Sequence, residues 1–142
     1  MITLKIRNPY YEATKKGETN YVGRAGDSGG AKDYWNNIKL NEKIMLQLVD
    51  NNDNPIENDN FEVTVKKISR YETIDDACQS IGIEESKNSK EDLSEYKLKE
   101  IGAKKLLPGI KTLSDAIGEY NSFKDYPGRL SKSKFIVIEF EK

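Results

Sequence analysis

The chain has 142 residues, of which 33% are charged and 36% hydrophobic, and its formal net charge is −1. This composition suits one ordinary globular domain, expected over residues 1–142, and no apolar run approaches the about 20 residues of a membrane-spanning helix. The absence of histidine excludes a Ser-His-Asp triad, a Cys-His pair and histidine-ligated zinc, and the single cysteine, Cys78, excludes an internal disulfide. We therefore expect no metal and no cofactor.

Two further expectations follow from the termini and the charges. The N-terminus lacks the apolar stretch of a secretory signal, which favours a cytoplasmic protein without membrane association.

The charges are distributed unevenly along the chain. Residues 1–24 carry five basic and two acidic side chains, residues 25–96 carry eight basic and 16 acidic ones, and residues 97–142 carry ten basic and six acidic ones. If the two ends pack together, the fold has a basic face. Lysine-rich surfaces that only keep the protein soluble would give the same pattern.

The first quarter of the chain predicts a strand, a helix, a strand and a loop. Residues 1–7 alternate between apolar and polar, which is typical of a strand. A short helix is expected over residues 10–16, ended by Gly17. Residues 19–24 are β-prone, and the glycine-rich stretch 25–32 predicts a loop of the kind in which ligands are often bound.

The rest of the chain predicts strands and helices in an α+β order. Apolar spacing predicts strands over residues 44–49, 60–71 and 134–141, and helices over residues 74–81, 93–107 and 113–123. Polar residues 50–59 indicate a hairpin loop, and Pro127-Gly128 a turn before the last strand. Terminal strands around central hairpin-like strands favour a mixed β-barrel with the helices packed outside it.

Several segments form a series along the chain: LKIRNPYYEA, a helix ending in KKG, a strand ending in GR, DYWNNIKLNEKIML, FEVTVKKISRYETIDDA, LLPGIKTLSDAIGEY and KFIVIEFEK. Together they resemble the ASCH domain, of the PUA-like β-barrel superfamily associated with RNA. Their order agrees with the family over essentially the whole chain. The resemblance implies a PUA-like mixed β-barrel with helices packed around it.

The family signature, G-x-K-x-x-E-x-R, lines the mouth of that barrel and is degenerate here. Gly17 and Arg24 match it, whereas Thr19 replaces the lysine and Val22 the glutamate. Small bacterial relatives hydrolyse N4-acylated cytidines with a lysine at the Thr19 position as the activating base. The pKa of a threonine hydroxyl is far too high for that role at neutral pH.

The degenerate signature leaves the enzyme assignment open and favours a protein without catalytic activity. If the chain is an enzyme, Lys15 or Lys16 would have to replace the missing lysine, with Lys16 the candidate we retain. Glu84 or Glu85 would stand near the family's glutamate, with Glu85 the candidate we retain.

The candidate ligand-binding residues combine cations, a hydroxyl and aromatic rings. They are Lys5, Arg7, Lys16, Thr19, Tyr21, Arg24 and Trp35. Arg24 binds a phosphate or a base edge through its planar guanidinium, or it pairs with Asp27 or Asp33. Tyr21 and Trp35 stack on a base, or Trp35 covers the barrel.

We expect a small ASCH-domain protein that binds RNA or a nucleotide-like ligand in the cleft at the barrel mouth. The alternatives are an amidohydrolase acting on N4-acylated cytidine or a related modified nucleoside, and a protein-interaction module.

Overall fold

A computed structural model describes residues 1–26, 37–123 and 126–142. Along the chain its elements are β1 (Thr3–Arg7), α1 (Tyr10–Lys15), β2 (Tyr21–Ala25), β3 (Lys43–Val49), β4 (Pro55–Tyr71), α2 (Ile74–Glu85), α3 (Glu95–Leu106), α4 (Leu113–Asn121), α5 (Tyr126–Ser133) and β5 (Phe135–Glu141). The predicted α+β class is confirmed, and both terminal segments are strands of the sheet.

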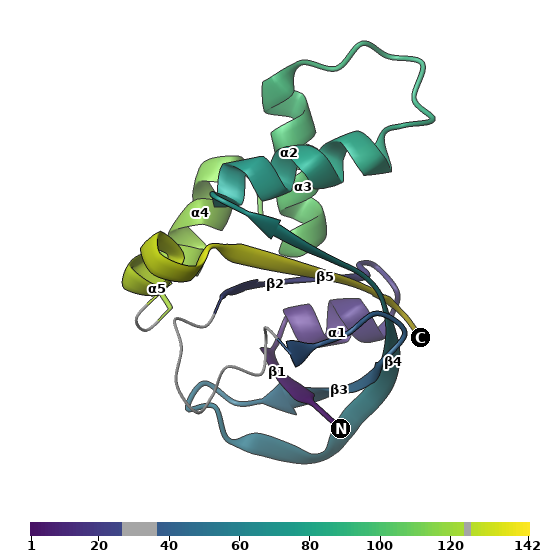
Figure 1. The fold of residues 1–142 in the computed structure, drawn as a ribbon, viewed down its shortest axis with the longest axis vertical. Coiled ribbons are helices and arrows are strands. Elements are labelled where there is room, and N and C mark those ends of the chain that lie inside the picture. Colours follow the sequence, from purple (N-terminus) through teal and green to yellow (C-terminus); the bar gives the residue numbers. More distant parts are fainter. Residues whose placement is uncertain (27–36, 124–125) are drawn as a thin grey trace.

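The strands form one curved sheet in the order β1-β3-β4-β5-β2. β1 and β3 are parallel, and the other three neighbouring pairs are antiparallel. The sheet bends so that the β2–β5 half faces the β1–β3 half (Figure 1). In the part of the chain that the structure describes, β1 and β2 are the two edges, so the predicted barrel is not closed. Instead of a main-chain ladder, the side chain of Arg24 reaches across from β2 to the main chain of β1.

Strand β4 starts earlier than the sequence predicts. Residues 50–59 have the composition of a loop, but β4 begins at Pro55 and pairs with β3 from there. Proline is tolerated as the first residue of a strand, and main-chain pairing needs no apolar side chains. The resulting strand of 17 residues has a register shift against β5 between Val65 and Lys67, where it passes from one half of the sheet to the other.

Two apolar clusters lie on opposite faces of β5. Ile136, Ile138 and Phe140 point into the concave side of the sheet, while Phe135 and Val137 point towards the helices. This alternation follows from the two-residue period of a strand. Helices α2, α3 and α4 pack outside the sheet as predicted, and α5 lies on the same side. Helix α1 does not, because it buries Tyr11 in the concave cluster.

Helices α2, α3 and α4 each begin at a capping hydroxyl. Thr73, Ser94 and Thr112 each accept a hydrogen bond from the main-chain N–H three residues later. In contrast, α5 was not expected, because Pro127-Gly128 reads as a turn. Here Pro127 lies in the first turn of the helix, where a missing N–H costs no hydrogen bond.

Candidate ligand-binding cleft

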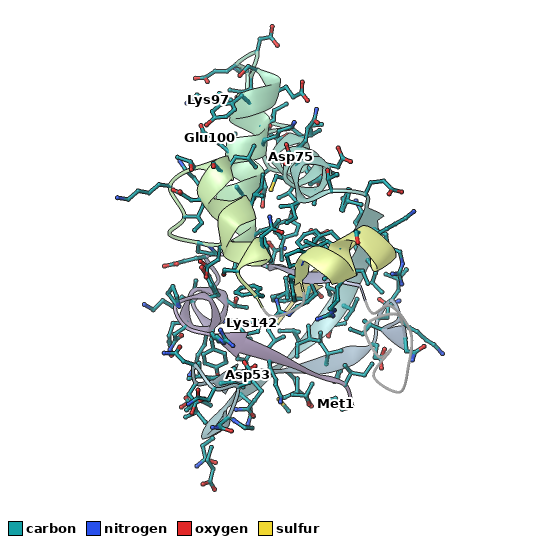
Figure 2. The ribbon with its side chains drawn as sticks, turned by 90° about the vertical axis from the view of Figure 1, so that its left-hand side faces the viewer. Met1, Asp53, Asp75, Lys97, Glu100 and Lys142 are labelled. Carbon is teal, nitrogen blue, oxygen red and sulfur yellow. The ribbon has the colours of Figure 1, made fainter. Side chains whose placement is uncertain are left out.

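The two edge strands β1 and β2 are not paired with each other, and we call the place where they approach the seam. A cleft of about 570 Å³ lies there. Figure 2 shows its surroundings, with α1 and β1 (purple) and the labelled Asp53 below α4 (green) and α5 (yellow). The seam is continuous with the start of α1 and with the loop that follows β3. The cleft therefore draws its walls from both ends of the chain.

Basic side chains outnumber acidic ones among the described residues of the cleft. Its cations are Lys5, Arg7, Arg24 and Arg129, and its carboxylates are Asp53 and Glu119. The basic excess of the cleft comes from residues 1–24, which supply Lys5, Arg7 and Arg24, whereas the C-terminal segment supplies Arg129 and Glu119, whose charges balance. A concave basic site raises the local concentration of anionic ligands.

Arg24 joins the two sheet edges. Its Nη1 donates a 2.8 Å hydrogen bond to the carbonyl of Gly23, and its Nη2 donates a 2.6 Å hydrogen bond to the carbonyl of Lys5. Val22 and Arg24 alternate with Tyr21 and Gly23 along β2, so the Arg24 side chain points to the cleft side of the sheet. Asp27 and Asp33, the acidic partners considered from the sequence, lie outside the described residues.

Arg7 forms an ion pair with Asp53 at the lower wall. The distance from Nη2 to Oδ1 is 2.8 Å, and Nε donates to the same oxygen at 3.2 Å. Both side chains are substantially exposed, so the pair adds little stability. Its effect is to hold the Arg7 guanidinium beside the cleft.

Thr19 lines the cleft and is 3% exposed. Its hydroxyl donates a 2.5 Å hydrogen bond to the carbonyl of Lys105 and accepts a 3.2 Å hydrogen bond from the N–H of Tyr21. Thr19 thus anchors the start of β2 to the end of α3. These two hydrogen bonds give Thr19 a structural role at the cleft wall.

Tyr21 contributes to the cleft wall, but its side chain belongs to the helical cluster on the other face of β2. Burial raises the pKa of its hydroxyl, and the charges of Glu139, Glu85 and Glu84 and a hydrogen bond with Glu85 add to this effect. Because the ring is packed under the helices, Tyr21 does not offer the stacking surface expected from the sequence.

The two candidate catalytic residues do not meet in the cleft. Lys16 is exposed at the end of α1 and is not among the residues that line the cleft. Glu85, at the end of α2, lies 3.6 Å from the ammonium of Lys105 and beside the hydroxyl of Tyr21, also outside the cleft lining. Trp35 lies outside the described residues.

Sequence analysis missed a second set of cleft residues, from the start of α1 and from α4 and α5. They are Tyr10, Glu119, Tyr120, Phe123, Tyr126 and Arg129. Arg129 donates a 3.0 Å hydrogen bond to the carbonyl of Ala25 and lies 5.1 Å from the centre of the Tyr126 ring. No local motif marks these residues; the available signal was the basic excess of the C-terminal segment together with its aromatic residues.

Comparison with known proteins supports the fold and not the site. No protein-family model matches the chain, and no curated protein matches it significantly. The crystal structure of hypothetical protein PH0355 has a TM-score of 0.65 against this chain, with 21% identity over 99% of this chain and 96% of that one. At this identity the likeness shows a shared fold alone.

The described residues contain no group of three or more acidic or cysteine side chains placed to hold a metal ion. Nor do they include a helix long and apolar enough to cross a membrane.

Proposed function

We propose that the protein is an ASCH-type domain that binds RNA or a nucleotide-like anionic ligand in the cleft between β1 and β2. The observation that carries this proposal is the combination of a cleft of about 570 Å³ with four cationic side chains. This volume is in the range of small-molecule sites. One guanidinium group can bind two oxygens of the same phosphate at once.

Aromatic side chains beside the cations support a nucleotide over a simple anion. Phe123 and Tyr10, both only partly buried, line the cleft, whereas Tyr126 is 7% exposed and meets the Phe123 ring edge to face, with centres 5.1 Å apart. Base stacking on aromatic rings contributes about 1–3 kcal/mol per base. Phosphate binding near β1 and base contact near α4 and α5 would use both walls at once.

The ASCH assignment is supported by the position of the two signature residues that the chain retains. Gly17, with φ of +84°, ends the turn after α1, and Arg24 projects from β2 into the seam. Arg24 lines the cleft, as the resemblance implies for a signature at the barrel mouth, and Gly17 lies in the turn two residues before the cleft residue Thr19.

The direct test is fluorescence anisotropy with a labelled single-stranded RNA of mixed sequence, titrated at about 50 and about 200 mM salt. Phosphate contacts make affinity fall steeply as salt rises. Lys5, exposed at the cleft, is the residue to change, because Lys5→Ala removes one cation without disturbing a buried group. We expect weaker binding and a salt slope reduced by about 1.

Lys97→Ala is the matched control, since Lys97 is an exposed lysine of α3, far from the cleft in Figure 2. Competition with unlabelled nucleoside monophosphates separates a small nucleotide ligand from RNA. Absence of salt-dependent binding by the native protein, or equal loss in both variants, would contradict the proposal and favour a protein-interaction module.

A further inference from the structure

Glu119 is one of the two carboxylates that line the described part of the cleft, beside four cations. It lies on α4, is half-buried, and faces the same cleft as Tyr10, Tyr120 and Phe123. A carboxylate at this place repels phosphate, so it does not belong to the phosphate-binding part of the cleft. It suggests instead a second part of the site that recognises hydrogen-bond donors.

Within residues 1–26, 37–123 and 126–142, no ion pair joins the Glu119 carboxylate to a basic side chain. The other carboxylate of the cleft, Asp53, is paired with Arg7. Its close polar neighbour is the hydroxyl of Tyr10. A carboxylate has about four acceptor positions, so one such neighbour leaves most of its capacity for a ligand.

Tyr10 helps to hold this acceptor in place. Burial raises the pKa of the Tyr10 hydroxyl, and the charge of Glu119 and a hydrogen bond with it raise the pKa further. The hydroxyl therefore stays protonated and remains a donor towards Glu119. Its position at the start of α1 links the carboxylate of α4 to the opposite wall of the cleft.

The four bases differ in what they present to a carboxylate. Guanine has two adjacent donors on its Watson–Crick edge, N1–H and the 2-amino group, which match the two oxygens of a carboxylate. Adenine and cytosine place a ring-nitrogen acceptor beside their amino group, and uracil flanks its single N–H with two carbonyls. Bases read in single strands are recognised through these edges.

We propose that the cleft selects guanine nucleotides, with Glu119 accepting hydrogen bonds from N1–H and the 2-amino group while Lys5 and Arg7 bind the phosphate. This inference rests on the proposed function and names its ligand class. Phe123, which is only partly buried, then flanks the base.

The experiment is isothermal titration of the native protein with GMP, IMP, AMP, CMP and UMP, beside an RNA oligonucleotide. We expect GMP to bind about tenfold more tightly than AMP, CMP or UMP, the size of effect that one bidentate base contact produces. IMP, which lacks the 2-amino group, should lie between. Glu119→Gln should remove the preference for GMP, because glutamine puts a donor where guanine needs an acceptor.

Glu100→Gln, the same change on α3 away from the cleft in Figure 2, is the matched control and should retain the preference. Equal binding of all five nucleotides, or a GMP preference that survives Glu119→Gln, would overturn this inference and leave the proposed function standing. RNA binding without mononucleotide binding would also overturn this inference and leave the proposed function standing. If neither RNA nor any nucleotide binds, both proposals fail.

Discussion

The guanidinium of Arg24 donates a 2.6 Å hydrogen bond to the main-chain carbonyl of Lys5, and so it joins the two edges of a sheet that does not close. A second bond from the same group reaches the carbonyl of Gly23. A residue that the sequence offered as a ligand-binding cation is therefore also part of the scaffold of the cleft.

Arg24→Ala should lower the free energy of unfolding by about 1–3 kcal/mol, since hydrogen bonds from a charged donor to two main-chain carbonyls are lost. Arg24→Lys should recover little of this, because an ammonium cannot span both carbonyls as a planar guanidinium does. Urea unfolding measures both. Full stability in Arg24→Ala would show that the seam does not depend on this side chain.

Gly82→Ala should destabilise the protein by about 1–3 kcal/mol or more, because α2 and α3 approach too closely for a side chain. A Cβ on Gly82 would lie 1.8 Å from the carbonyl oxygen of Leu98, in main chain that has no flexible end to move. Gly118→Ala in α4 is the control. A Cβ there meets nothing within 4 Å, so alanine should stabilise the helix by about 0.5–1 kcal/mol. Thermal or urea unfolding that ranks the two variants in the opposite order would contradict the packing.

Cys78 predicts a pH dependence of stability. Burial raises the pKa of its thiol from about 9 to about 12. Between these values the unfolded chain loses the thiol proton and the folded chain keeps it, so this contribution to stability is complete below about pH 9 and is lost as the pH rises. By pH 10 the loss is about 1.4 kcal/mol.

The measurement compares urea unfolding of the native protein and Cys78→Ala between pH 8 and pH 10. The variant starts lower, because it has lost buried atoms, but it should lose less stability over this range. Parallel pH profiles would mean that the thiol titrates alike in both states. As an independent check, the native thiol should react slowly with alkylating reagents until the protein unfolds.

We expect no hydrolysis of N4-acetylcytidine by the native protein at neutral pH. The hydroxyl at the family's lysine position is hydrogen-bonded to Lys105 and Tyr21, and Lys16 is not among the cleft residues. A chromatographic assay for cytidine release, run beside Lys16→Ala, tests this. Turnover that disappears in Lys16→Ala would make Lys16 the base and the protein an amidohydrolase. Thr19→Lys is a poor gain-of-function test, since position 19 is 3% exposed and a lysine there would be buried.

The regular elements could be predicted wherever side-chain pattern and local backbone chemistry agree. The alternating apolar residues of β1 and the apolar run of β5 gave both terminal strands, and Gly17 marked the end of α1 through its positive φ. The start of β4 could not be read, because its first residues are polar and it is held by main-chain pairing with β3. Helix α5 was hidden for a related reason, since a proline is equally compatible with a turn and with the first turn of a helix.

The cleft residues could likewise be predicted from the sequence only where they lie close together along the chain. Lys5, Arg7 and Arg24 could be named because they lie close together in sequence beside a recognisable signature. Glu119 and Arg129 could not, because they reach the same cleft from helices about a hundred residues further on. Tyr21 was assigned to the ligand although it packs under the helices, because the sequence does not reveal which face of a short edge strand meets which layer.

The alternation along β5 has a consequence for cooperativity. Phe135 and Val137 belong to the helical cluster, while Ile136 and Ile138 belong to the concave one, so a single strand contributes side chains to both apolar clusters. Detaching β5 would expose both clusters in one event, and neither half of the molecule would retain a buried interior. The two walls of the cleft should therefore form and disappear together, in one two-state transition, even though they derive from opposite ends of the chain.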